Sequence, residues 1–309
     1  MIPQLAGPDA GVAWHYGDPL REQRLLAEGA AGVDLSHRPV FTVAGPDRLS
    51  WLNNIVSQKI DDLAPGVWTQ AYILDAHGHL AHAFTAVDDG ETLWGSTEPG
   101  HEEALLAWLT RMRFAARAEI ASRATSHALV IAPASAGGAA GPRIVPRDQV
   151  EATLGPVRAG TWAWEALRIA DGVPRIFLDT DDKTIPNELA NPVGDLLGPA
   201  VHLRKGCYPG QETVARVYNL GRPPRRLTLL LLDGSVDTLP EVGAELLLEG
   251  RVIGRVGTSA RHFELGPIGL ALVKRSVPPD AELLVGEIAA SQEPLVDPEV
   301  GLHVRPRLR

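Results

Sequence analysis

Apolar residues in the first half of the chain follow helical spacing at three places. Asp18-Pro19 predicts the start of a helix that runs to about Gly29, because Asp caps helices well and Pro is favoured at the first helical position. A second predicted helix starts at residues 45–47, with Leu49, Leu52 and Val56 on one face. A third follows residues 98–99, where four apolar residues lie at i, i+3, i+4 and i+7: Leu105, Trp108, Leu109 and Met112.

Other apolar runs have the length and composition of strands. Residues 40–43, 68–75 and 80–87 are strand-like, and His77-Gly78 marks a turn between the last two. Residues 162–169 and 175–178 are mixed apolar stretches on either side of a turn at 171–174, and residues 134–142 predict a loop. After Pro224 the chain is predicted to be all-β, as a small barrel or sandwich, from four runs: 226–232, 244–248, 252–258 and 268–273.

Composition excludes several classes of protein. The 309 residues are 45% hydrophobic and 22% charged, which is typical of a globular protein of two or three domains. The net charge of −9 argues against a general binder of nucleic acid or anionic membranes. We see neither a secretory signal nor an apolar run near the roughly 20 residues of a membrane span, so we expect a cytoplasmic protein.

Common catalytic and metal motifs are missing from the sequence. It contains no dinucleotide or phosphate-binding glycine fingerprint and no nucleophile elbow. His77, His79 and His82 are close together, but residues 79 and 82 of a strand point to opposite faces. With a single cysteine, the chain has no internal disulfide or cysteine-only metal site, and we predict no metal.

The segment around Cys207 stands out chemically. Lys205-Gly206-Cys207-Tyr208-Pro209-Gly210 places the only thiol between two glycines and beside a cation, which favours the reactive thiolate. Gln211 and Glu212 add an amide and a carboxylate. Residues 204–226 contain six cations and one acid, so this stretch carries +5 and suits an anionic small ligand. The alternative is a solvated basic face with a buried, inert cysteine.

Eight consecutive residues carry a resemblance to a known family. Residues 205–212 match the K-G-C-Y-x-G-Q-E signature of the YgfZ-type folate-binding proteins, which resemble T-protein, the aminomethyltransferase of the glycine cleavage system. Further segments resemble the family pattern in the expected order, so the resemblance covers nearly the whole chain. They are residues 34–36, 43–48, 167–169, 172–174, 185–189, 225–227, 254–257 and 269–273.

The resemblance implies an α+β fold of three domains arranged as a T-protein-like cloverleaf around a central channel. Two interwoven α+β domains would occupy residues 1–222, and a C-terminal β-barrel would occupy 223–309. It also implies that tetrahydrofolate or a derivative binds in the channel. The implied role is that of an accessory protein for assembly or repair of iron–sulfur clusters, with indirect effects on iron–sulfur enzymes, including those that modify tRNA.

Site residues follow from the same resemblance. Cys207 would be the reactive thiol with Lys205 beside it, and Arg168, Asp171 and Arg226 are candidate folate contacts. We expect a monomer whose partners are folate and iron–sulfur carrier or client proteins, without direct contact to nucleic acid or membrane. The functional motif comprises Lys205, Gly206, Cys207, Tyr208, Gly210, Gln211, Glu212 and Arg216.

Departures from T-protein bear on the mechanism. T-proteins carry a G-G-x-x-D-D pattern with a catalytic aspartate where this chain has His82 and Ala83, and a Glu where it has Ala170 next to Asp171. They also lack the cysteine. These differences favour the iron–sulfur role over the alternative, a folate-dependent one-carbon transferase, in which His82 or Asp171 would have to supply the acid. Whether the protein is an enzyme stays open between these two hypotheses.

Overall fold

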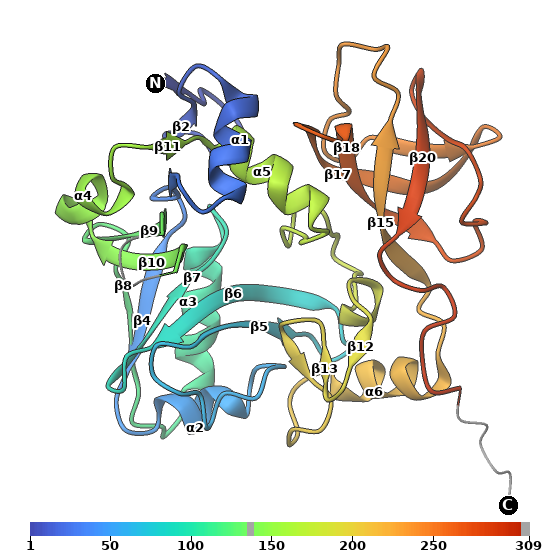
Figure 1. The fold of residues 1–309 in the computed structure, drawn as a ribbon. Coiled ribbons are helices and arrows are strands. Elements are labelled where there is room, and N and C mark those ends of the chain that lie inside the picture. Colours follow the sequence, from blue (N-terminus) through green and yellow to red (C-terminus); the bar gives the residue numbers. More distant parts are fainter. Residues whose placement is uncertain (135–138, 304–309) are drawn as a thin grey trace, which may run out of the picture.

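The computed structural model describes residues 1–134 and 139–303. A five-stranded antiparallel sheet forms the first lobe, at the lower left of Figure 1. Helices α2 (Arg48–Asn53) and α3 (Glu102–Met112) pack against one face of it, where Leu105 and Leu109 are fully buried against Phe84 and other sheet residues. The strands in spatial order are β5 (Trp68–Leu74), β6 (Leu80–Asp88), β7 (Thr92–Ser96), β4 (Val40–Ala44) and β8 (Glu119–Ser122).

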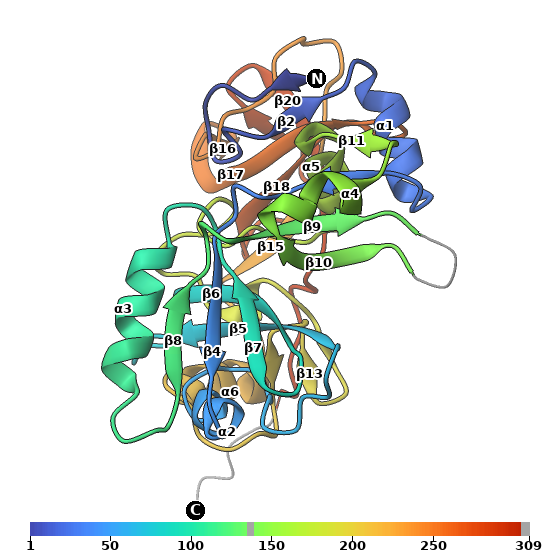
Figure 2. The same ribbon diagram turned by 90° about the vertical axis from the view of Figure 1, so that its left-hand side faces the viewer.

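A four-stranded mixed sheet organises the second lobe (Figure 2). Helix α1 (Pro19–Ala27) begins where Asp18 accepts a hydrogen bond from the amide of Arg21, as its N-cap position predicts. Helix α5 (Thr161–Ala170) packs against α1 and extends from this lobe to the barrel. The other elements are β1 (Ile2–Pro3), β2 (Ala13–His15), β3 (Gly32–Asp34), β9 (His127–Ala132), β10 (Gly141–Pro146), α4 (Val150–Leu154) and β11 (Arg158–Ala159).

The third lobe is a closed barrel at the upper right of Figure 1. Its interior is filled by aliphatic side chains such as Leu230, Leu246 and Val273. The barrel is contacted by α5, which packs on β17. Its strands in spatial order are β15 (Arg225–Leu232), β18 (Gly266–Lys274), β17 (Arg251–His262), β16 (Glu245–Leu248), β19 (Leu283–Val285) and β20 (Ile288–Pro294).

A small connecting region lies between the first lobe and the barrel. Helix α6 (Gln211–Leu220) follows the cysteine segment and leads into β15. After the barrel the chain returns to this region, where the amide of Leu302 donates to the carbonyl of Tyr218. The three short strands of its sheet are β12 (Pro192–Val193), β13 (Leu196–Leu197) and β14 (Val201–His202).

The predicted α+β cloverleaf with a C-terminal barrel is confirmed. Of the two predicted forms of the C-terminal region, it is a barrel and not a sandwich. The second predicted helix is shorter than its apolar pattern: α2 ends at Asn53, and Val56 is buried beyond the helix end. Residues 135–138 of the predicted loop at 134–142 lie outside the described residues. The predicted domain boundary at 222/223 stays a prediction, and the first barrel strand starts at Arg225.

Candidate functional site

The cysteine segment forms a loop between β14 and α6, and the side chain of Cys207 is exposed. The alternative of a buried, inert cysteine is therefore wrong. A Cβ on the neighbouring Gly206 would have no other atom of the described residues within 4 Å, so the backbone beside the thiol is open as well. Within residues 1–134 and 139–303, no group of three His, Cys, Asp or Glu side chains has the arrangement of a metal site.

Lys205 has a different environment from its neighbour Cys207. Its ammonium is buried and donates to the backbone carbonyls of Asn53, Val56 and Gln58, the last at 3.1 Å. It also lies 5.1 Å from the centre of the Tyr208 ring. Burial lowers the pKa of Lys205 to about 8 and raises that of Tyr208 to about 12. The contacts of this ammonium thus hold the loop against the 53–58 segment of the first lobe.

Gly210 fixes the other end of the loop. It has a φ of +76°, and a Cβ there would lie 2.6 Å from the carbonyl oxygen of Asp75 and 2.8 Å from Cα of Gly78. The loop therefore abuts the turn between β5 and β6. Gln211 and Glu212 form the first turn of α6, where Glu212 is exposed, and Arg216 is exposed one turn later.

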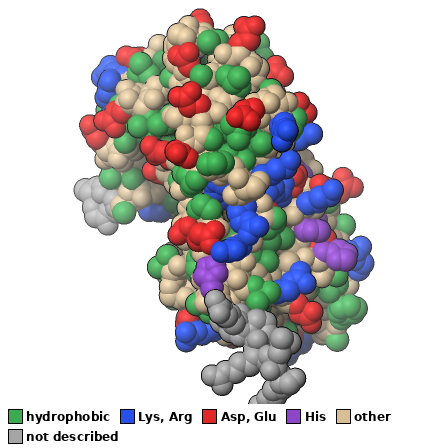
Figure 3. Space-filling model, turned by 90° about the vertical axis from the view of Figure 1, so that its right-hand side faces the viewer, with side chains coloured by type: hydrophobic (Ala, Val, Ile, Leu, Met, Phe, Trp, Pro, Cys, Tyr) green, Lys and Arg blue, Asp and Glu red, His purple; other side chains and the backbone are tan. Residues whose placement is uncertain are grey.

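The local positive charge of residues 204–226 is largely neutralised in the structure. Arg204 pairs with Asp195, Arg222 with Glu299, and Arg225 with Asp181 and Glu188. On the face that carries α6 and the barrel, Lys and Arg side chains have Asp and Glu side chains beside them (Figure 3). The +5 of the segment therefore does not appear as an equally strong basic surface.

The three candidate folate contacts lie apart from one another. Arg168 is buried and binds Glu165, Asp179 and Thr258. Arg226 is buried in the barrel, where it donates to the carbonyls of residues 274, 275 and 277 and to Gln292. Asp171 is exposed at the C-terminal end of α5. None of the three lines the cavity of about 160 Å³ at the junction of the first and second lobes, which we call the central cavity.

The central cavity lies where the first and second lobes meet the 173–176 segment. Polar side chains point to it from three places: Arg38 before β4, Ser96 and Glu98 at the end of β7, and Trp164 on α5. Several buried polar atoms at this cavity have no hydrogen-bond partner among the described residues: Arg38 Nε and Nη2, Ser96 Oγ and Trp164 Nε1. Unpaired buried polar atoms are rare in proteins, so the bonding of these atoms is completed by ordered water or by a polar ligand in the cavity.

A buried ion cluster borders the cavity. We define it as Arg38, Arg175, Asp9, Glu98 and Glu165. Arg175 binds Glu98 at 2.7 Å, Asp9 at 2.9 Å and Glu165 at 3.2 Å. Burial by itself raises the pKa of Glu98, but the charges of Arg38 and Arg175 bring it below its ordinary value. Likewise, the His37 hydrogen bond and Arg175 outweigh burial and lower the pKa of Asp9 to about 2. The carboxylates of Glu98 and Asp9 are therefore ionised at neutral pH.

The alternation of side chains along β6 places His82 and Ala83, the positions of the missing T-protein acid, on opposite faces of the sheet. Phe84 and Ala86 pack in the core on the α3 side of β6. His82 shares that side, because side chains alternate along a strand, and its ring lies 6.1 Å from that of Trp108. Ala83, on the opposite face, lines the central cavity. Neither His82 nor Asp171 supplies an acid there; the carboxylate that lines it is Glu98, which the sequence analysis missed.

No family model matches the chain. The tRNA-modifying protein YgfZ of Edwardsiella ictaluri is 30% identical in an alignment of 300 positions that covers 82% of this chain and 87% of that protein. The chain belongs to the YgfZ family. YgfZ of Escherichia coli (strain SMS-3-5 / SECEC) is 38% identical over 113 residues, 36% of this chain and 33% of that protein.

Other similarities are shorter or concern the fold alone. A chloroplastic protein of Arabidopsis thaliana is 31% identical over 120 residues, which span 37% of this chain and about a quarter (26%) of that relative. The crystal structure of the glycine cleavage system aminomethyltransferase T of Bartonella henselae superposes with a TM-score of 0.74 over 96% of this chain and 94% of that chain. At 18% identity, this match shows that the YgfZ-family chain has the T-protein fold.

Proposed function

We propose that the protein binds tetrahydrofolate or a derivative in the central cavity. The supporting observation is the group of unpaired buried polar atoms on Arg38, Ser96 and Trp164. A pterin ring has donors and acceptors along its edge and a flat face for an indole. A cavity of about 160 Å³ is smaller than most drug-sized ligand sites, so it would enclose the ring and leave the rest of the folate outside.

Three residues would have distinct roles toward the ring. Trp164 Nε1 would donate a hydrogen bond, and Ser96 Oγ can donate or accept one. Arg38 would donate through its unpaired Nε while Nη1 stays 3.5 Å from Glu98. Because Arg38 and Arg175 keep Glu98 ionised, its carboxylate is an acceptor for amino or ring N–H groups of the ligand.

We further propose that the protein acts in the cytoplasm as an accessory factor for assembly or repair of iron–sulfur clusters. The exposed thiol of Cys207 supports this role, because an accessible thiolate can ligate cluster iron transiently. One cysteine cannot hold a cluster by itself, so a carrier or client protein would supply the remaining ligands. Effects on tRNA-modifying enzymes would then be indirect, and we propose that the protein works as a monomer.

Calorimetric titration with tetrahydrofolate tests the cavity. Trp164→Phe keeps an aromatic ring without the donor and should weaken binding about five- to tenfold, as expected for one lost hydrogen bond to a buried group. Trp68→Phe is the matched control, because Trp68 lies outside the central cavity. Equal affinity of the wild type and Trp164→Phe would exclude the proposed contact.

Complementation tests the thiol separately. In cells lacking the protein, the Cys207→Ala variant should fail to restore iron–sulfur enzyme activity while its folate affinity stays normal. Full rescue by the variant would remove the proposed role of Cys207. The alternative one-carbon transferase would be supported instead if the purified protein transferred a one-carbon unit from an N-methyl or aminomethyl donor to tetrahydrofolate.

A further inference from the structure

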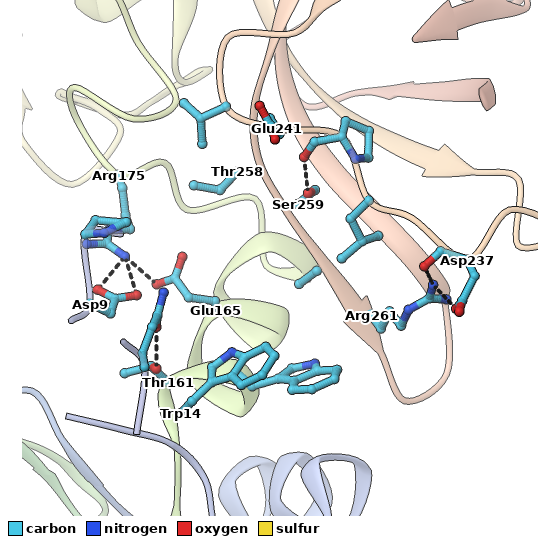
Figure 4. Close-up of a pocket in the computed structure, with 17 residues that line it drawn as sticks. Asp9, Trp14, Thr161, Glu165, Arg175, Asp237, Glu241, Thr258, Ser259 and Arg261 are labelled. Carbon is cyan, nitrogen blue, oxygen red and sulfur yellow. Dashed lines mark hydrogen bonds and ion pairs between the residues drawn. The ribbon is translucent and has the colours of Figure 1, made fainter. Parts of the chain in front are cut away.

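A second cavity, of about 510 Å³, lies between the second lobe and the barrel, and the proposed folate site does not use it. Its volume falls within the range of roughly 300–1,000 Å³ that is typical of small-molecule sites. Figure 4 shows its walls: Asp9, Arg175 and Glu165 of the ion cluster on one side, Trp14 below, and the Asp237–Arg261 pair on the opposite side. The cavity is therefore built from segments far apart in the sequence.

Two stacked indoles form the aromatic wall. Trp14 on β2 and Trp162 on α5 have ring centroids 4.7 Å apart with an interplanar angle of 23°. Trp14 remains 40% exposed. The pair is held by a close backbone approach, since a Cβ on Gly160 would lie 2.1 Å from the carbonyl oxygen of Trp14. An accessible indole face attracts cations through its quadrupole.

Negative charge dominates the rest of the lining. Two guanidiniums, of Arg175 and Arg261, face four carboxylates, so the formal balance is 2 − 4 = −2. Arg175 is bound by the ion cluster, and Arg261 by the carboxylate and carbonyl of Asp237. Glu165 is bound by Arg175 through Oε1 and by Arg168 through Oε2, so among the described residues Glu241 is the lining carboxylate without an ion pair. The four carboxylates belong to Asp9, Glu165, Asp237 and Glu241.

We propose that this cavity binds a small organic cation, an alkylammonium compound. Its ammonium group would lie against the accessible indole of Trp14 and be neutralised by the carboxylate of Glu241 at the barrel side. An anionic ligand, including the glutamyl tail of a folate, would meet a negative lining whose guanidiniums are already bound. The two cavities share Arg175, but Trp14, Trp162 and Glu241 line this one and not the central cavity.

Calorimetric titration at neutral pH with choline and with n-butylammonium tests the proposal. The neutral isostere of choline, 3,3-dimethyl-1-butanol, is the ligand control. We expect saturable binding of at least one ammonium compound with one site per chain, and no binding of the alcohol. Trp14→Leu, which keeps an apolar side chain but removes the π face, and Glu241→Gln should each weaken binding about tenfold.

Matched measurements separate this site from the folate site. Glu264→Gln removes an exposed barrel carboxylate outside the cavity and should leave binding unchanged. Circular dichroism and thermal unfolding establish that each variant is folded. The proposal is overturned if neither ammonium compound binds, if the neutral alcohol binds equally well, or if Trp14→Leu weakens tetrahydrofolate binding instead. The last outcome would assign the cavity to the folate tail.

Discussion

Gly210 and Gly78 approach each other so closely that a Cβ on Gly210 would lie 2.8 Å from Cα of Gly78. Both have positive φ angles, +76° and +85°. The contact joins the end of the cysteine loop to the turn of the β5–β6 hairpin, which belongs to the first lobe. The exposed position of Cys207 therefore depends on two backbones that tolerate no side chain between them.

Gly210→Ala should destabilise the protein by about 1–3 kcal/mol, because it adds both a left-handed strain and a clash. Chemical denaturation followed by circular dichroism measures the change. Gly206→Ala is the matched control within the same motif, since its Cβ would meet nothing within 4 Å, and it should leave stability nearly unchanged. Equal effects of the two substitutions would contradict the proposed packing.

Arg175→Met should lower the free energy of unfolding by about 3–5 kcal/mol, because it removes a guanidinium that binds Asp9, Glu98 and Glu165 and leaves their buried charge only partly compensated by His37, Arg38 and Arg168. Arg204→Met removes an arginine whose side chain is 79% exposed and should have no measurable effect. Denaturant midpoints of the two variants and the wild type at neutral pH measure both effects. A small effect of Arg175→Met would mean that the ion cluster relaxes or takes up water.

His82 should make the protein less stable in mild acid. Burial, followed by the charges of His101 and Arg111, lowers the pKa of His82 below its ordinary 6.5. As the pH falls through 6.5, the unfolded chain binds a proton that the folded chain does not, so the free energy of unfolding decreases. Asp9 affects the free energy of unfolding only at a lower pH, since its pKa in the folded state is about 2.

Thermal unfolding at pH 7.5 and 5.5 measures this effect. His82→Phe should reduce the loss of stability between the two pH values, whereas the exposed His77→Gln should not change it. An unchanged pH dependence in His82→Phe would assign the acid sensitivity to other groups.

The Cys207 thiol should react with Ellman's reagent in the native protein, with one thiol per chain, because its side chain is exposed. Cys207→Ser should abolish the reaction and leave thermal stability unchanged. Reaction only after addition of denaturant would show that the thiol is shielded in solution.

Elements with strong local patterns were predictable from the sequence. The apolar stripe from Leu105 to Met112 is helix α3, and the run around Leu229 is barrel strand β15. Helix α6 was missed because its apolar stripe is short: Val214, Val217 and Tyr218 lie at i, i+3 and i+4, and Val214 is the only one of them that is fully buried. Strands β19 and β20 were missed as well, because β19 has only three residues and the buried positions of β20 after Ile288 are Ala290 and Gln292, which give no apolar alternation.

The site was only partly predictable, for a different reason. The motif located Cys207, but the sequence does not show which arginines find partners inside the protein. Arg168 and Arg226 resemble ligand-binding cations in the sequence, yet their partners are contributed by residues as distant as Thr258 and Gln292. Arg38 and Arg175 lie outside any periodic pattern, and only the tertiary structure brings them to the central cavity.

The hydrogen bonds of Thr258 in the barrel determine when the second lobe can complete its packing during synthesis of the chain. Its amide and hydroxyl both bind Asp179, at 2.6 and 2.7 Å, and its hydroxyl also accepts from Arg168. During translation, α5 and the 173–179 segment emerge about eighty residues before this partner does. Until β17 leaves the ribosome, the groups of Asp179 and Arg168 that later bind Thr258 remain hydrated. The second lobe therefore reaches its final packing only after most of the barrel has been made.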